Sequence, residues 1–268
     1  LLEDANKQLP LIDKVIIDYI PESQPEILKF KKHELFWVGL DRDNFAQMVQ
    51  KKENGEFHLN KEYSQQYDLY YEPTLSISYL PINMKDPILG KNKNLRKAIA
   101  HAIDFENKIQ LLANGRGIKL HTVVPITIAG SQKDIGDFGY QFNPIKAKKL
   151  LAEAGYPGGK GLSPIELTLS GNSTAHRNTF EFYRNSLAQI GIKLKPDYKT
   201  WTGYLKATER GDFQIATSAW AADYPDPENF YQLFYGPNKP PGQNSSSFNN
   251  DKYNKIYEEI RFMENGEK

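Results

Sequence analysis

The stretch IELTLSGNSTAHRNTFEFYRNSLAQIGIKLKPDY, residues 165–198, decides the fold class. Residues 165–171 and 192–198 are rich in the side chains that favour strands, and residues 172–191 between them predict a helix. A short polar loop joins the first strand to the helix. This order predicts a strand–helix–strand unit.

Further helix signals lie on the N-terminal side of this unit. Asn143 is a suitable N-cap for a helix that has Pro144 in its first turn and ends at Gly155. Residues 92–115 carry apolar side chains at close to helical spacing and predict one more helix. The repeated alternation of strands and helices predicts an α/β domain over roughly residues 85–268.

Two loops follow predicted strands of this domain: GNSTAHR at 171–177 and AADYPDPEN at 221–229. In open α/β sheets, ligands bind outside the carboxyl ends of the strands. We therefore expect the functional residues in these two loops. Outside the domain, residues 11–20 are rich in β-branched side chains and predict a strand.

Composition excludes several classes of function. Lys and Arg number 34 against 33 Asp and Glu, so the charge gives no case for nucleic acid as a partner. No apolar run approaches the roughly 18–20 residues that span a bilayer. The chain has no cysteine, which excludes disulfides and a thiol nucleophile. Its opening LLEDANKQLP lacks an initiator Met, and its last residues suggest a helix cut short, so we expect a segment of a longer protein.

The second loop holds the main candidates for chemistry. Asp226 precedes Pro227 and Glu228, which is typical of a helix start. Asp223 has no such structural role, and a carboxylate beside Trp220 and Tyr224 suits an amine, through an ion pair and a cation–π contact. A pair of carboxylates is also what a glycoside hydrolase uses, so an enzyme stays open at this point.

The first loop offers His176, an imidazole placed to meet a carboxylate or phosphate, or else a solvated loop side chain. The other histidines show no metal-ligand spacing, and no nucleotide-binding or nucleophile motif is present. We expect no metal and no cofactor.

Three stretches carry a further signal: LRKAIAHAID at 95–104, NPIKAKKLLAEAGYPGGKG at 143–161 and AWAADYPDPENF at 219–230. Together they resemble the extracytoplasmic solute-binding proteins of peptide, dipeptide and nickel ABC importers, family 5. The resemblance implies a type II periplasmic-binding-protein-like α/β lobe, with a mixed sheet flanked by helices and part of the first lobe attached. Residues 1–75 would then be the tail of the first lobe and the approach to the hinge, and residues 76–268 the second lobe, truncated at its end.

The resemblance also implies a function. Such receptors capture a peptide between two lobes and deliver it to the membrane permease of the importer. We expect a monomeric, non-enzymatic receptor with a peptide ligand and no nucleic acid, in the periplasm or otherwise outside the cytoplasm. The resemblance is also compatible with a lipid anchor on a preceding segment.

Carried over by position, the resemblance assigns ligand-binding roles. Asp223 matches the aspartate that binds a peptide's α-amino group, Trp220 a pocket wall, and His176 a histidine near the peptide's C-terminal part. Thr217 stands where the best-known receptors have an arginine for the peptide carboxylate, and Pro81 replaces a hinge acid. These departures leave peptide length and C-terminal recognition open. Completing the expected ligand-binding set, we name Tyr224 and Asn83.

Other readings remain at this stage. The same fold also serves receptors for nickel, haem or oligosaccharide, because a fold does not fix its ligand. A two-carboxylate hydrolase would need a second acid about 5–9 Å from Asp223. An interaction protein that uses this fold without transport is the third alternative.

Overall fold

The structure is a computed structural model of the chain. It describes all residues except 1–7, 9, 21, 129–130, 132–138 and 264–268. The chain divides into two compact units, residues 1–69 and 70–268. No described helix combines the length and the apolar character needed to cross a membrane.

The described part of the first unit contains two helices and one small hairpin. Its elements are α1 (Ser23–Lys31), α2 (Arg42–Met48) and the antiparallel strands β1 (Val49–Lys51) and β2 (Phe57–Leu59). The buried side chains of this unit come mainly from the helices: Ile27, Phe45, Met48 and Val49. The carboxylate of Asp41 caps α2 by accepting a hydrogen bond of 2.8 Å from the N–H of Asn44.

The strand expected at residues 11–20 is not formed, so that expectation is wrong for this structure. Most of its β-branched side chains are exposed, with Val15 and Ile16 each at 73%. A strand needs a neighbour that pairs with its main chain, and no described residue pairs with this segment. Local β propensity alone does not make a strand.

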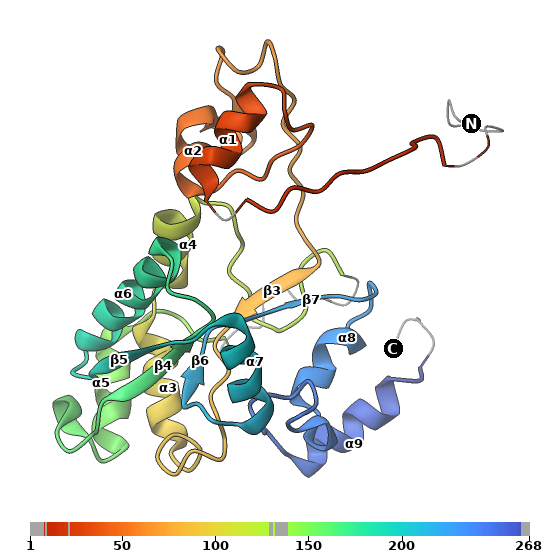
Figure 1. Ribbon diagram of the computed structural model, residues 1–268. Helices are drawn as coiled ribbons and strands as arrows, with labels where there is room; N and C mark the ends of the chain where they lie inside the picture. The colour runs from red at the N-terminus through yellow and green to blue at the C-terminus, as the bar shows by residue number, and fades with distance from the viewer. Residues whose placement is uncertain (1–7, 9, 21, 129–130, 132–138, 264–268) are drawn as a thin grey trace. The chain divides into compact units, whose positions relative to one another are not determined.

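The second unit is built on a parallel sheet with the strand order β5–β4–β6 (Figure 1). The central strand β4 (Ile165–Leu169) pairs with β5 (Leu194–Tyr198) on one side and β6 (Ile215–Ala216) on the other. Helix α6 (Thr174–Ala188) connects β4 to β5. The predicted strand–helix–strand unit is therefore confirmed.

A second, antiparallel pair joins segments far apart in the sequence. Strand β3 (Ser76–Tyr79) pairs with β7 (Ser218–Ala221), and Ile77 lies opposite Trp220. Because β7 follows β6 after one residue, the chain passes directly from the parallel sheet into this antiparallel pair (Figure 1). The described strands of the unit are thus mixed in direction, as expected.

The remaining elements of the second unit are helical. They are α3 (Lys93–Ala102), α4 (Phe105–Ala113), α5 (Pro144–Glu153), η2 (Pro157–Gly159), α7 (Trp201–Arg210), α8 (Glu228–Tyr231), η3 (Gln232–Phe234), η4 (Gly236–Asn238) and α9 (Asp251–Ile260). Asn143 caps α5 and Pro144 opens it, which confirms the sequence reading of this helix.

The single helix expected over residues 92–115 is wrong in one respect, because it is two helices. The break falls at Ile103 and Asp104, whose main-chain angles are extended rather than helical. The Asp104 carboxylate accepts a hydrogen bond of 3.0 Å from the N–H of Asn107 and so caps α4. An aspartate inside a helical pattern can begin a new helix instead of continuing the old one.

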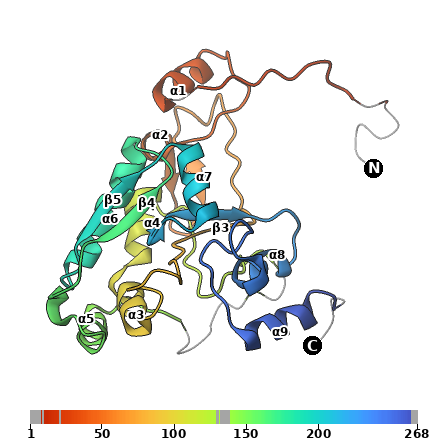
Figure 2. The same cartoon turned by 60° about the horizontal axis from the view of Figure 1, so that its bottom comes forward.

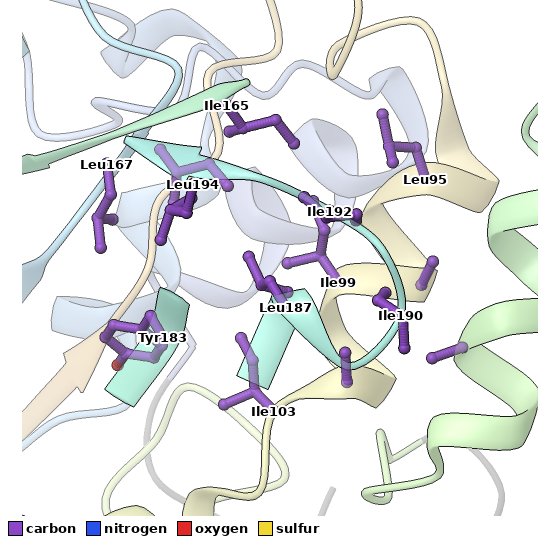
Figure 3. Packing of buried hydrophobic residues seen from close by; sticks show 14 of the residues in the cluster. Leu95, Ile99, Ile103, Ile165, Leu167, Tyr183, Leu187, Ile190, Ile192 and Leu194 are labelled. Carbon is purple, nitrogen blue, oxygen red and sulfur yellow. The ribbon is translucent and has the colours of Figure 1, made fainter. Parts of the chain in front are cut away.

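Helices cover both faces of the parallel sheet. One face packs on α3, α5 and α6 through a large aliphatic cluster that includes Leu95, Leu167 and Leu187 (Figure 3). Burial of each such side chain stabilises the fold by about 1.5–3 kcal/mol. Ile215 joins this cluster, whereas the next residue, Ala216, contacts the separate cluster of α7. Since successive strand residues point to opposite faces, α7 covers the other face, and Figure 2 shows it there.

Candidate ligand-binding site

A cavity of about 360 Å³ lies at the carboxyl ends of the parallel strands. Leu169 and Ser170 mark the end of β4 at its wall, and Thr217 follows β6. The remaining walls come from β3, α4, α6, α7 and β7. This is the position at which α/β sheets bind ligands. Two of the residues expected from the sequence, His176 and Thr217, are brought together here.

His176 is held in place by its own helix start. Its Nδ1 lies 2.8 Å from the hydroxyl of Ser173, and Ser173 is also the N-cap of α6. A side chain at Gly171 would meet the imidazole, because a Cβ there would lie 2.6 Å from its Cε1. The ring therefore lies against the end of β4, and its Nε2 has no hydrogen-bond partner among the described residues.

Thr217 connects the cavity to the sheet and to α7. Its N–H donates to the carbonyl of Thr168 at 3.0 Å, and its carbonyl accepts from the hydroxyl of Tyr204 at 2.7 Å. Tyr204 in turn stacks on Trp201, with ring centroids 5.7 Å apart and planes inclined by 12°. Trp201 is 61% exposed. These contacts make α7 the aromatic wall of the cavity.

Lys108 of α4 and Tyr183 of α6 complete the polar lining. The Lys108 Nζ lies 5.6 Å from the centre of the Tyr183 ring. Burial lowers the pKa of Lys108 and raises the pKa of Tyr183.

Asp223 lies in the loop after β7 and outside the cavity lining. Its side chain is exposed and makes no hydrogen bond or ion pair with the described residues. Its main-chain N–H donates to the Oδ1 of Asn229 at 3.3 Å, and the same oxygen accepts from the Nε1 of Trp220 at 2.8 Å. Asn229 is fully buried, and its two hydrogen bonds hold the indole of Trp220 and the main chain of Asp223 in place.

Trp220 itself is half-buried in an apolar cluster that includes Ile77 and Phe230. Tyr224, in contrast, is 47% exposed, and its hydroxyl donates to the carboxylate of Glu228, which raises the pKa of the tyrosine. The structure thus anchors one of these two aromatic rings in the fold and leaves the other at the surface.

Asp226 lies at the start of α8, as its sequence context predicts, and directly precedes the N-cap residue Pro227. Its carboxylate accepts a hydrogen bond of 2.8 Å from the N–H of Glu228, the first residue of the helix. A two-carboxylate hydrolase would need a second catalytic carboxylate near Asp223. The Asp226 carboxylate instead accepts a main-chain hydrogen bond at the start of α8. This observation counts against the hydrolase alternative.

Asn83 is placed in the interior and not in the cavity lining. The side chain is 5% exposed. Its Nδ2 donates to the carbonyls of Gly211 and Phe213 at 2.8 and 2.9 Å, and its Oδ1 accepts from the N–H of Lys85 at 2.9 Å. These bonds tie the segment that follows β3 to the turn between α7 and β6, which is a structural function.

Sequence reasoning missed most of the lining residues and the buried Asn229. Among the missed lining residues are Lys108, Tyr183, Trp201 and Tyr204. They lie on three helices, and a sequence pattern does not say which helix positions face a sheet end. Asn229 had one usable signal, because it belongs to the DPEN run that starts α8.

An α/β unit with an open cavity at its strand ends defines a ligand-binding domain. Residues 3–242 match the family described as "Bacterial extracellular solute-binding proteins, family 5 Middle", and the chain belongs to this family. The family consists of binding proteins rather than enzymes, which agrees with the sequence expectation. Its extracellular location confirms the expected place outside the cytoplasm.

Individual proteins show the same relationship. The chain is 25% identical to heme-binding protein A of Haemophilus influenzae over 96% of this chain and 44% of the relative. It is 26% identical to the dipeptide-binding protein of Escherichia coli over 84% of this chain and 40% of the relative. The chain therefore spans less than half the length of these relatives.

A solved structure supports the fold. The periplasmic binding protein DppA of Helicobacter pylori, in complex with the peptide STSA, matches 90% of this chain and 44% of its own, with a TM-score of 0.72 and 27% identity. The expected α/β fold of type II periplasmic binding proteins is thereby confirmed.

Proposed function

We propose that the full-length receptor is the substrate-binding component of an ATP-driven importer. It captures peptides between two lobes and passes them to a membrane permease. In this proposal residues 1–75 are the tail of the first lobe, and residues 76–268 are most of the second. Similarity to the dipeptide-binding protein and to the binding protein in complex with the peptide STSA supports peptides as ligands.

The proposal rests on the exposure of the Asp223 carboxylate and on its lack of a partner among the described residues. Its carboxylate is exposed and unpaired among the described residues, while its main chain is fixed through Asn229. An ammonium group loses its hydration when it is bound, and a carboxylate partner compensates for that loss. A partner that is already held in position also reduces the ordering cost of binding. Asp223 is thus suited to the α-amino group of a peptide.

The other expected ligand-binding residues have different support. His176 and Thr217 line the cavity and are available to the part of a peptide beyond its amino end. Tyr224 offers an exposed ring beside Asp223, and Trp220 supports the same loop from inside. The role of Asn83 in ligand binding stays a prediction that its buried hydrogen bonds do not favour.

Calorimetry of the full-length receptor with a mixed library of di- to pentapeptides tests the proposal. We expect binding that N-terminal acetylation abolishes, and we expect Asp223→Asn to weaken binding more than tenfold. Asp212→Asn makes the same chemical change at another exposed aspartate and should leave the affinity unchanged. Peptides that bind equally well to the Asp223→Asn variant would remove Asp223 from the site, and no peptide binding at all would refute the proposal.

Haem is the second candidate, because one relative is named for it. In that case the free Nε2 of His176 would hold the haem iron. Titration of the receptor with haem should then produce a shifted Soret band that His176→Ala abolishes. An unchanged spectrum would exclude this ligand mode.

A further inference from the structure

Helices α3 and α5 are strongly basic together with the residues that lead into them. Residues 87–102 and 139–155 contain seven Lys or Arg and a single acid, Glu153, although the two signs of charge nearly balance over the whole chain. The one arginine, Arg96, is used within the fold, because its Nη1 donates to two main-chain carbonyls at 2.6 and 2.8 Å. The six lysines are Lys91, Lys93, Lys97, Lys146, Lys148 and Lys149.

The two helices lie side by side, as Figures 1 and 2 show. Hydrogen bonds at both ends make the pair antiparallel. The Asn92 side chain donates to the carbonyl of Ala154 at 2.8 Å at one end, and the N–H of Asn143 donates to the carbonyl of His101 at 2.8 Å at the other. Both helices turn their apolar residues to the large aliphatic cluster, so their lysines lie on the outer side of the pair.

The charge of these lysines is not neutralised within the described part of the chain. None of the six side chains makes an ion pair or a hydrogen bond with a described residue, and all are exposed except the half-buried Lys97. A hollow of about 440 Å³ opens beside the start of α3, and its lining includes Lys91 and Lys93 but no carboxylate. Like charges repel each other, and a facing anion relieves the repulsion. This surface is therefore complementary to an anionic partner.

Exposed apolar side chains adjoin the lysines. Tyr140 is 49% exposed, Phe142 41% and Ile145 84%. The ring of Tyr140 lies 5.3 Å from that of His101 in α3, so this segment crosses from one helix to the other. Ile145 shares a face of α5 with the lysines three and four residues after it. Apolar and aromatic side chains beside lysines are typical of proteins that bind at a membrane interface.

We propose that this basic face, the six lysines together with Tyr140, Phe142 and Ile145, binds the surface of an anionic phospholipid membrane. The lysines attract the headgroups, while the apolar side chains enter the headgroup region. The residue types favour lipid over a protein partner, since specific protein interfaces are enriched in arginine and depleted in lysine. The inference goes beyond the proposed function and does not depend on the ligand that the receptor captures.

Cosedimentation of the full-length receptor with vesicles tests the inference, and the receptor is produced without lipid modification. One set of vesicles contains equal parts of phosphatidylglycerol and phosphatidylcholine, and the other set contains phosphatidylcholine alone. We expect binding to the anionic vesicles to be at least about tenfold tighter. This preference should shrink as the salt concentration is raised, because salt screens the lysine charges.

Variants of the face identify the residues that bind. Lys148→Gln/Lys149→Gln removes two charges from the face and should weaken binding to anionic vesicles about tenfold, whereas Lys148→Arg/Lys149→Arg should bind as wild type does. The matched control, Lys206→Gln/Lys252→Gln, removes two charges from exposed positions on α7 and α9 and should change the affinity less than about twofold. Ile145→Ser should weaken binding about threefold even at high salt, because it removes an apolar contact and not a charge.

Several outcomes overturn the inference. Equal binding to both kinds of vesicle, or binding to neither, is one. An unchanged affinity in Lys148→Gln/Lys149→Gln is another, as is an equal loss in the control variant, because the charge would then act from no particular face. Phosphatidylcholine vesicles that contain the permease of the proposed importer test a protein partner instead. If the receptor binds only these, and the Lys148→Gln/Lys149→Gln variant loses that binding, the face docks on protein and the lipid inference is wrong.

Discussion

Asn229→Ala should destabilise the fold and loosen the Asp223 loop. Asn229 is fully buried, and its Oδ1 accepts from the Trp220 indole at 2.8 Å and from the Asp223 N–H at 3.3 Å. Loss of a partner costs about 1–3 kcal/mol for each buried donor left unsatisfied. Trp220 is half-buried and Asp223 exposed, so water replaces part of these bonds.

The expected net change follows from these contributions. The Trp220 bond should contribute about 1–2 kcal/mol, and the longer bond to Asp223 about 0.5 kcal/mol. The Nδ2 of Asn229 is buried without a partner among the described residues, so its removal relieves a small cost. We therefore expect the free energy of unfolding to fall by about 2 kcal/mol.

Urea unfolding of the variants measures this change, and Asn178→Ala, an exposed position on α6, is the control that should stay within about 0.5 kcal/mol of wild type. A double-mutant cycle with Trp220→Phe should give a coupling energy of about 1 kcal/mol. If Asn229→Ala loses less than about 0.5 kcal/mol, or if the cycle shows no coupling, the buried amide does not hold the loop. A loosened loop should also bind peptides more weakly, since Asp223 would have to be ordered on binding.

The remaining predictions concern a tight turn and alkaline pH. Gly159→Ala should lower the free energy of unfolding by about 3 kcal/mol, because φ is +79° and a Cβ would lie 1.9 Å from the Gly191 carbonyl oxygen. Gly158→Ala, with φ of +61° and free space, should cost only about 1 kcal/mol in the same urea experiment, and equal losses would contradict the steric argument. Burial raises the pKa of Tyr183, so above about pH 10 the unfolded chain releases this proton first and binds fewer protons than the native state. Stability present below that pH is therefore lost as pH rises, and unfolding curves at pH 9 to 11 should show a smaller loss of stability for Tyr183→Phe than for wild type. Tyr70→Phe changes an exposed tyrosine and should lose as much stability as wild type. If Tyr183→Phe also loses as much stability as wild type, the buried Tyr183 phenol is not the cause of the loss.

Local signals in the sequence were sufficient where one segment decides its own structure. Asn143 and Pro144 lie at a helix start in the structure, and the strand–helix–strand order of residues 165–198 is present. These features depend on capping and on short-range patterns. The same reasoning joined α3 to α4, because the capping function of Asp104 competes with a helical pattern that is otherwise continuous.

Features that depend on distant partners were less predictable. Residues 11–20 have strand propensity but no described partner. His176 and Thr217 were predictable as ends of strands, and the parallel order of β4 and β6 brings them to one cavity. Lys108 was not predictable, because only the packing of α4 beside α6 directs it to that cavity.

The two polar ends of the proposed site are connected by one short stretch of chain. Thr217 ends the parallel pairing at the cavity, and Asp223 follows β7 only six residues later. Six extended residues span at most about 20 Å, so no more than that separates Thr217 from Asp223 along the main chain. In the proposed function, a peptide whose amine pairs with Asp223 reaches the cavity at Thr217 within that span. Since an extended peptide also rises about 3.3 Å per residue, short peptides are long enough to contact both Asp223 and the cavity.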